Sequence, residues 1–588
     1  MSEKISLIFP NQKLNYKKLS DLTIHDIGMD GIITRLSKEK NEQTYIANVM
    51  RLMTDDAENA RYRSDVFHDI FRNKKMREEM MELLDRINFL REYGSYKHEH
   101  DHDPSVWDLL HRLEEINDYI ECIDAIHSCL EKADISSKGL NNLKEYVGKL
   151  YEDNGFEGLR KDIRELRADT QNLKSITVGI NLNERFEACG IGVISINNKP
   201  FSKSMVVKHF IDKVNPRDSI HEGIDWDGDY RFDQFSAKNP KAEGTKFIPP
   251  MFSPLAMMSL MNVSEADERT RTITNYMDEI TDRMLSNMTK HLRSVLSKYT
   301  MMTITDVTDL MPEFIYYIRW AEYIEREQEK GAVFCKPEVL QSPASGKKDA
   351  LGESDGQKAC KSNDKISMNA EGIYNIKLIG DASRDYENDI VKNNLDFSDE
   401  HNLYILTGAN RGGKTTITQT IGQLFFIAQG GIYVPGTKFE YTPLDAIYTH
   451  FPADEDKTMD LGRLGEECKR FREIFSESTD KSLLLLNETF STTSFEEGYY
   501  IAKDCVKAIL SKGTRTIYNT HMHKLALDID EINEGMGQKK SASLIVKSEE
   551  GKRSYEVAVA PPVGMSYARD IAEKYGVTYE ELTEGFHM

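Results

Sequence analysis

Apolar side chains spaced three and four residues apart characterise the first half of the chain. Between Asp65 and Tyr93 they form a stripe made up of Val66, Ile70, Phe71, Met76, Met80, Leu83, Leu84, Ile87 and Leu90. Because this spacing places side chains on one helical face, we predict one or two amphipathic helices there. A second set from Trp107 to Ile120 predicts another helix. The pattern returns between about Ser264 and Lys330, with breaks near Thr300 and Pro312.

Two segments depart from this helical pattern. The sequences SITVGINL and IGVISIN, within residues 175–197, are rich in β-branched side chains and predict two short strands. Residues 336–366 consist mainly of Ser, Gly, Lys, Asp and Pro, with little apolar periodicity. We interpret residues 336–366 as a flexible linker or long loop.

Short, uninterrupted apolar runs mark the last third of the chain. They are Leu403–Thr407, Ser482–Leu486 and Thr514–Asn519, and the segment TITQTIGQLFFIAQ after the first run predicts a helix. Runs of this length are typical of strands that are buried on both faces of a parallel sheet.

Composition narrows the class of protein. The 588 residues allow about two to four domains. No run of about 18 apolar residues occurs and Pro10 interrupts the N-terminal apolar run, so we expect neither a membrane span nor a signal peptide. The odd number of cysteines, without a C-x-x-C pair, indicates reduced thiols and a cytoplasmic protein. The net charge of −21 argues against a chain that coats nucleic acid over its whole surface, although a local basic face remains compatible with it.

Two polar features in the first half allow more than one interpretation. The segment KHEHDHDP, residues 97–104, contains alternating His and Asp, which is either a set of metal ligands or a polar loop that ends at Pro104. We favour the loop, because alternation does not give the i, i+4 spacing of helical metal motifs. A basic helical face with Arg283, Lys290, His291, Arg293 and Lys298 either contacts a phosphate backbone or is simply solvated.

A phosphate-binding loop follows the first buried run. The pattern G-x-x-x-x-G-K-[ST] fits residues 408–415, between a predicted strand and a predicted helix. Glycines let the backbone N–H groups point inward, and the helix N-terminus favours negative charge. We expect Lys414 to reach the β- and γ-phosphates and Thr415 to contact Mg²⁺. The predicted nucleotide-binding residues are Gly408, Ala409, Asn410, Arg411, Gly412, Gly413, Lys414, Thr415 and Thr416.

The ends of the other two apolar runs carry the remaining candidate chemistry. The run of four leucines ends in Asn487-Glu488, where an Asp normally holds Mg²⁺ through water and the following Glu polarises the attacking water. An amide at Asn487 accepts a hydrogen bond from metal-bound water but brings no charge, so we expect weaker Mg²⁺ binding. Glu488 remains a candidate general base and metal ligand. His521 is a candidate sensor of the γ-phosphate.

Five segments in this order resemble the ATPase domain of the MutS family, a branch of the ABC-type ATPases. They are TGANRGGKT, YVPGTKFEYTPLDAIYTHF, LLLLNETFSTTSFEEG, NTHMHKL and VGMSYARDIAEKYGV, between about Ile390 and Tyr579. The resemblance implies an α/β ABC-type P-loop ATPase domain over residues 367–588. It further implies a mostly α-helical core, lever and clamp-like region over residues 51–335, with a small β element and a clamp-like insertion around 175–270. Residues 1–50 form an N-terminal segment.

The resemblance also implies a composite active site in a dimer. In the family, a signature segment of one ATPase domain completes the site of the other. Here that segment resembles residues 458–467, with Leu461 at the family's Ser position and Gly462 and Arg463 beside it. Alignment of VKNNL to the family's V-x-N segment places Ile390 and Asn393 near the adenine.

Departures from the family limit what can be carried over. Residues 1–50 show no counterpart of the mismatch-reading domain, and residues 51–335 resemble the family's helical region only loosely. No Smr-type nuclease sequence follows the ATPase-like segment. We therefore do not expect mismatch reading.

Three hypotheses of function remain open at the level of sequence. The first is an ATPase that couples dimer closure to the binding of duplex or structured DNA through backbone and shape. The second is a low-turnover, ATP-dependent switch or scaffold with a protein partner, which Asn487 and Leu461 favour. The third is a chain that uses ATP only for stability.

Overall fold

We describe the fold from a computed structural model. It describes residues 5–11, 13–83, 106–170, 174–182, 184, 188–197, 286–296, 310–340, 367–379, 386, 389–408, 412–452, 462–549, 552–562 and 575–583. The chain forms two compact units that interleave along the sequence. Unit 1 comprises residues 1–5, 78–133 and 142–311, and unit 2 comprises residues 6–77, 134–141 and 312–588.

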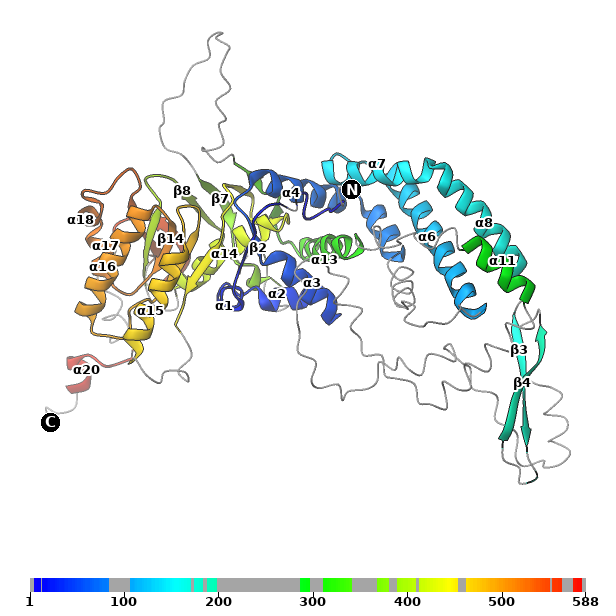
Figure 1. The fold of residues 1–588 in the computed structure, drawn as a ribbon. Helices are drawn as coiled ribbons and strands as arrows, with labels where there is room; N and C mark the ends of the chain where they lie inside the picture. Colours follow the sequence, from blue (N-terminus) through cyan, green and yellow to red (C-terminus); the bar gives the residue numbers. More distant parts are fainter. Residues whose placement is uncertain are drawn as a thin grey trace, which may run out of the picture. The chain divides into compact units, whose positions relative to one another are not determined.

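The main sheet of unit 2 has six strands, of which β14 is labelled in Figure 1. Their order in space is β12 (Ile447–His450), β13 (Leu483–Asn487), β14 (Arg515–Asn519), β9 (Leu403–Thr407), β15 (Ser541–Glu549) and β16 (Lys552–Val559). All neighbours run parallel except β15 and β16, which form an antiparallel hairpin. The three strands predicted from the apolar runs are therefore confirmed. Strand β9 has the predicted ends, and the ends of β13 and β14 differ from the predicted ones by at most one residue.

Helices cover both faces of the central strands of this sheet, which explains why β9, β13 and β14 are buried at every position. On one face, alternate strand residues such as Leu484, Leu486 and Tyr518 pack against α15 (Gly462–Glu477), α16 (Phe495–Lys512) and α17 (His523–Leu527). On the other face, α14 (Lys414–Gln429) packs so closely that a Cβ on Gly422 would lie 2.7 Å from both Leu485 Cδ1 and Ile27 Cγ2. Burial of successive strand residues in opposite layers is the reason for the continuous leucine run.

A second sheet of unit 2 has four strands. Their order in space is β6 (Glu338–Val339), β11 (Lys438–Tyr441), β7 (Met368–Ile373) and β8 (Asn393–Phe397). A separate pair joins β5 (Phe334–Cys335) to β10 (Val434–Pro435). Strand β6 falls at the start of the range that the sequence suggested as a linker, and residues 341–366 of that range lie outside the described residues.

The amino-terminal part of unit 2 contains helices that the sequence did not predict. They are α1 (Asp21–Asp26), α2 (Asp30–Leu36) and α3 (Lys40–Met50), followed by the predicted helix α4 (Ala57–Arg72). The helix α13 (Met311–Gln328) was also predicted from the apolar pattern. Two buried glutamines of α14 bind this part of the chain: Gln423 donates to the carbonyl of Ile27 at 2.8 Å, and Gln429 donates to that of Thr54 at 3.0 Å.

A buried carboxyl group and a buried guanidinium hold the start of unit 2. Glu313 on α13 accepts hydrogen bonds from Ser6 Oγ at 2.8 Å and from the backbone N–H of Ile8 at 3.2 Å. Burial raises the pKa of Glu313 to about 7. Arg63 on α4 donates to the carbonyl of Ile8 at 2.8 Å and to that of Gln429, at the end of α14, at 3.1 Å. Residues before β1 (Lys17–Lys18) are thus fixed to the helix that begins at the phosphate loop.

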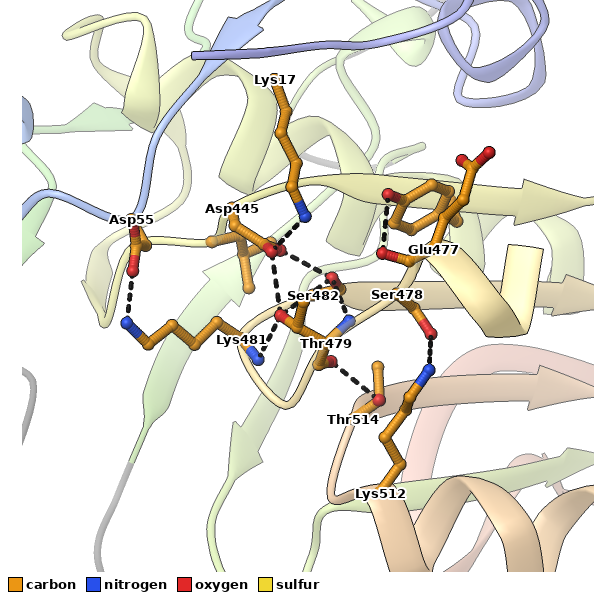
Figure 2. A network of polar contacts seen from close by, with 12 residues as sticks. Lys17, Asp55, Asp445, Glu477, Ser478, Thr479, Lys481, Ser482, Lys512 and Thr514 are labelled. Atoms are coloured by element: carbon orange, nitrogen blue, oxygen red, sulfur yellow. Dashed lines mark hydrogen bonds and ion pairs between the residues drawn. The ribbon is translucent and has the colours of Figure 1, made fainter. Parts of the chain in front are cut away.

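A polar network closes the end of the sheet where β12, β13 and β14 begin (Figure 2). Asp445, just before β12, accepts hydrogen bonds from Lys17 Nζ at 2.6 Å, Ser482 Oγ at 2.6 Å and Thr479 Oγ1 at 2.9 Å. Burial alone would raise the pKa of Asp445, but these three donors outweigh it and hold that pKa below its ordinary value. Thr514 adds a bond to the carbonyl of Thr479 at 2.8 Å. We call these contacts the amino-edge network.

The described residues of unit 1 form helices and a β-hairpin. The helices α6 (Val106–Lys132), α8 (Asn154–Thr170) and α11 (Ser286–Leu296), with most of α7 (Lys138–Glu152), carry buried apolar side chains. Of these, α6 and α11 overlap segments whose apolar spacing predicted helices. Strands β3 (Ser175–Leu182) and β4 (Ala188–Asn197) pair antiparallel and confirm the predicted β element (Figure 1). The segment KHEHDHDP lies outside the described residues. In the described part of the chain, no helix combines the length and the apolar character needed to cross a bilayer.

Candidate functional site

The phosphate loop joins β9 to α14 as the sequence predicts. Strand β9 is buried throughout, and α14 begins at Lys414. Gly408 has φ +142° and Gly413 has φ +92°, which L side chains rarely adopt, so these two glycines are required by the loop geometry. The predicted binding residues Ala409, Asn410 and Arg411 lie outside the described residues. The described part presents the N-terminus of a 16-residue helix to the loop, which favours a bound phosphate.

Lys414 is largely buried and lies over the loop. Its Nζ donates to the carbonyl of Gly408 at 3.0 Å. Burial lowers the pKa of Lys414, and the nearby Glu488 carboxylate opposes part of that shift. A buried ammonium beside backbone N–H groups gains much more from a bound phosphate than an exposed lysine does, because little water screens the interaction.

Three polar side chains meet where β13, β14 and α14 come together. The parallel register places Asn487 directly beside Asn519. Asn487 Oδ1 accepts hydrogen bonds from Asn519 Nδ2 and, at 3.4 Å, from Thr415 Oγ1. The predicted Thr415 and Asn487 are therefore brought together. Asn519 is a further site residue that sequence reasoning missed.

Glu488 and His521 form the next pair along the same edge. The two groups are joined by a contact of 3.0 Å between His521 Nε2 and Glu488 Oε1, and the backbone N–H of His521 donates to Glu488 Oε2 at 3.3 Å. Glu488 has φ +54°, and its backbone N–H donates to the carbonyl of Asn519 at 2.9 Å. A non-glycine residue in the left-handed region is strained, and such strain is concentrated at functional sites. The geometry brings the predicted base and the predicted sensor into direct contact.

His523 is a second histidine of the site that the sequence analysis did not single out. Its Nδ1 is buried and has no hydrogen-bond partner among the described residues. Burial lowers the pKa of His523, and the charges of Lys414 and His521 lower it further. The lowered pKa favours the neutral form of the His523 imidazole, which lies near Lys414. The second His of the NTHMHKL segment was the signal for it in the sequence.

Ile390 and Asn393, the residues aligned with the family's adenine segment, lie just before β8 and at its start. Ile390 is buried. Asn393, at the start of β8, uses both ends of its amide on β16: it accepts from the backbone N–H of Val557 at 2.8 Å and donates to the carbonyl of Tyr555 at 3.3 Å. Tyr555 has φ +57°, is about half exposed, and its Cδ1 would lie 3.3 Å from a Cβ placed on Gly413. Asn393 thus binds the backbone of β16 at Tyr555, whose ring lies beside Gly413.

The predicted in-trans residues lie at the exposed start of α15. Gly462 has φ +70°, and Gly462 and Arg463 are both exposed, whereas Leu461 lies outside the described residues. Further along α15, the ring of Phe471 packs edge-on against that of Phe490, in the loop after β13, with 5.5 Å between the ring centroids. The helix that begins with these exposed residues is therefore bound to the loop that follows Glu488.

Comparison with known proteins agrees with the resemblance seen in the sequence. Two family models match: MutS domain V at residues 404–581 and the MutS2 N-terminal domain at residues 55–329. Similar curated proteins include an endonuclease MutS2 of Thermus thermophilus, which is 28% identical over 194 residues, or 33% of this chain and 25% of that protein. A DNA mismatch repair protein MutS, from another strain of Thermus thermophilus, is 30% identical over 192 residues, or 32% of this chain and 23% of that protein.

A third relative, the DNA mismatch repair protein MutS 2 of Halobacterium salinarum, is 26% identical over 192 residues, or 32% of this chain and 22% of that protein. The match thus spans about a quarter of the length of these relatives. The chain is MutS-related: a segment that matches MutS domain V follows a helical region that matches the MutS2 N-terminal domain.

Proposed function

We propose that this chain is an ABC-type P-loop ATPase of the MutS-related group that couples nucleotide-driven dimer closure to the binding of duplex or structured DNA. The relatives named as mismatch repair proteins motivate DNA as the partner. We do not extend the proposal to mismatch reading, because no segment of residues 1–50 resembles the family's mismatch-reading domain.

One observation supports the ATPase proposal most directly. Lys414, at the start of the loop helix, faces the Glu488 carboxylate, and His521 is joined to that carboxylate at 3.0 Å. A phosphate-binding cation, a carboxylate and an imidazole thus converge on the carboxyl edge of a parallel sheet. This is where ligands bind in open α/β sheets.

The proposed roles follow from the chemistry of each group. Lys414 and the loop N–H groups bind the β- and γ-phosphates and neutralise charge that develops as the γ-phosphoryl leaves. Glu488 orients the attacking water and accepts its proton. His521 reports the γ-phosphate, because a bound phosphate competes with Glu488 for its Nε2. Gly462 and Arg463 are exposed, as a contact with the second subunit of a homodimer requires.

Magnesium would be held mainly by the nucleotide. Within the described residues, no group of three or more His, Cys, Asp or Glu side chains is placed to bind a metal ion. Mg²⁺ is commonly bound by substrate phosphates and few protein groups, so this does not conflict with the proposal. The hydroxyl of Thr415 fits as one ligand, and Asn487 and Glu488 fit as acceptors for metal-bound water. When bound, Mg²⁺ would neutralise charge on the β- and γ-phosphates.

The experiment is steady-state ATP hydrolysis with Mg²⁺, measured alone and with added duplex or branched DNA. Lys414→Ala provides the blank. We expect turnover that rises with DNA and disappears in the variant. Turnover at the level of the blank under every condition would exclude a DNA-coupled ATPase.

The second candidate function is a low-turnover, ATP-dependent switch that acts on a protein partner. The neutral Asn487 between Thr415 and Asn519 favours it, because an amide supplies no charge to hold the metal. Under this alternative the chain binds ATP with an affinity that depends on Lys414, but hydrolysis stays near the blank with or without DNA.

A further inference from the structure

The hydrogen bonds around Asn487 do not explain why residue 487 is an amide. In both hydrogen bonds described for its side chain, Asn487 accepts through Oδ1, from Asn519 Nδ2 and from Thr415 Oγ1 at 3.4 Å. An aspartate oxygen would accept both bonds at least as well, because bonds to charged acceptors are stronger. An aspartate at residue 487 could therefore accept the same two hydrogen bonds as Asn487. The two residue types differ there in charge.

Asn519 provides a second, independent observation. It is 1% exposed, and its Oδ1 has no hydrogen-bond partner among the described residues. Buried polar atoms are nearly always paired in folded proteins, so an unpaired one in a candidate site indicates a group that is completed by ligand or water. The oxygen belongs to the side chain that fixes Asn487, at the same strand position on the neighbouring strand.

Three charged or titratable side chains of the described residues lie around the Asn487–Asn519 pair. Lys414 provides a buried cation, Glu488 a carboxylate that is 18% exposed, and His521 a half-exposed imidazole in contact with that carboxylate. With Asp at residue 487, two adjacent carboxylates would face the triphosphate, and a divalent cation would be needed to offset their repulsion. With Asn there, Glu488 is the carboxylate that the described residues place at the site, and Lys414 opposes its charge.

We infer that the Asn487–Asn519 amide pair makes this a site for nucleoside triphosphates whose binding depends little on a divalent cation. The inference rests on the proposed function, because it concerns the same nucleotide site. It separates two events that a carboxylate would couple: the triphosphate binds to the loop and Lys414 with or without metal. Metal is then required only for hydrolysis.

The test compares nucleotide affinity in Mg²⁺ and in EDTA. The dissociation constant of adenylyl imidodiphosphate, a non-hydrolysable ATP analogue, is measured by isothermal titration calorimetry for the wild type and for Asn487→Asp. We expect the two conditions to differ less than about fivefold in the wild type. In Asn487→Asp we expect EDTA to weaken binding a further tenfold or more, because one added charge near the phosphates is worth at least that factor in a partly buried site.

The matched control is Asn394→Asp, which makes the same chemical change at an exposed position of β8. The Oδ1 of Asn394 accepts from the backbone N–H of Gly372 at 2.7 Å, which an aspartate also does. We expect this variant to keep the wild-type ratio of the two dissociation constants. Thermal unfolding of each variant shows whether the fold is retained.

Asn519→Asp provides a second variant in case Asn487→Asp does not fold. It places the same charge on the neighbouring strand, where the amide of Asn487 can turn to donate to it. We expect a raised ratio here too. If the ratio of the dissociation constants in EDTA and in Mg²⁺ is the same in the wild type and in both aspartate variants, the inference is overturned. Nucleotide binding itself would remain intact in that case. If the wild type binds the analogue no better than Lys414→Ala does, in Mg²⁺ and in EDTA alike, the proposed function is overturned as well.

Discussion

The two ends of the same parallel strands differ in how completely their polar groups are paired. At the amino edge, the Asp445 carboxylate accepts three hydrogen bonds, and the hydroxyls of Thr479, Ser482 and Thr514 all have partners. At the carboxyl edge, the buried atoms Thr407 Oγ1, Asn519 Oδ1 and His523 Nδ1 have none among the described residues. Glu488 and Phe490 there have positive φ.

This difference separates stability from function within one sheet. Paired polar groups at the amino edge lower the free energy of the folded chain. Unpaired groups and strained backbone at the carboxyl edge raise it, and they are retained where a ligand completes them. Substitutions at the amino edge should therefore change stability with little effect on nucleotide binding, and substitutions at the carboxyl edge should do the reverse.

The largest effect is expected at Lys414. Lys414→Ala removes the buried cation beside the loop, so we expect nucleotide affinity and turnover to fall by about 100- to 1,000-fold. The melting temperature should not fall, since the variant also removes a desolvated charge. Calorimetric titration and a thermal melt test both statements. A large fall in melting temperature would show that this lysine belongs to the stabilising groups.

Glu488→Gln should separate binding from chemistry at the same edge. Replacing the base should lower turnover by about 100-fold or more, while ATP still binds and accumulates in a dimer. Size-exclusion chromatography with ATP and Mg²⁺ measures the dimer, and phosphate release measures turnover. If the chain is instead a low-turnover switch, the variant should change an already slow rate very little.

Asp445→Ala should have the largest effect on stability. It leaves Lys17 Nζ, Thr479 Oγ1 and Ser482 Oγ without their acceptor, and we expect a loss of about 2–3 kcal/mol in the free energy of unfolding. Urea denaturation measures this loss. The affinity for ATP should remain within about twofold, and a tenfold loss of affinity would contradict the separation of the two edges.

Acid should affect the two ends of β12 in different pH ranges. Burial, with Arg470 adding to it, lowers the pKa of His450 at the carboxyl end to about 4. The stability that this histidine contributes is present above its unfolded pKa near 6.5 and is lost as the pH falls toward 4, by about 3 kcal/mol or less. The pKa of Asp445 is held below 3.8, so its contribution is lost only below that value. His450→Gln should reduce the pH dependence of the free energy of unfolding between pH 6.5 and 4. Asp445→Asn should reduce that dependence below pH 4. Urea denaturation of each variant across both pH ranges measures these changes. If both variants reduce the pH dependence equally in the same range, the assignment of one range to each residue is contradicted.

The smallest effect is expected at Tyr555, which reaches the carboxyl edge from β16. Its ring lies over Gly413, so Tyr555→Ala should weaken ATP binding severalfold, up to about tenfold, by removing an aromatic contact surface. Inorganic tripolyphosphate, which has no base, should bind equally to both proteins. An equal loss for tripolyphosphate would mean that the ring supports the loop instead.

Local patterns in the sequence were sufficient for the strands and for the loop. The apolar runs predicted β9, β13 and β14, and the glycine-rich motif placed Lys414 and Thr415 at a helix start. These features depend on neighbours in the chain, so a single sequence contains them.

Contacts between distant segments were not predictable in the same way. Asn519 lies beside Asn487 only because β14 is inserted between β13 and β9 in the sheet, an order that no local pattern encodes. Lys17 and Asp445 are 428 residues apart, and residues 1–50 had no pattern from which their helices could be predicted. Several partners of the N-terminal segment lie hundreds of residues further along the chain, such as Glu313 for Ser6 and Asp445 for Lys17.

That separation has a consequence for synthesis of the chain. Lys17 leaves the ribosome roughly 20 to 90 seconds before Asp445, at elongation rates of about 5–20 residues per second. During that interval Leu7 and Ile8, both fully buried in the folded chain, have no completed core to enter. The nascent amino-terminal segment must therefore stay in solution, or bound to a chaperone, until translation has passed β12.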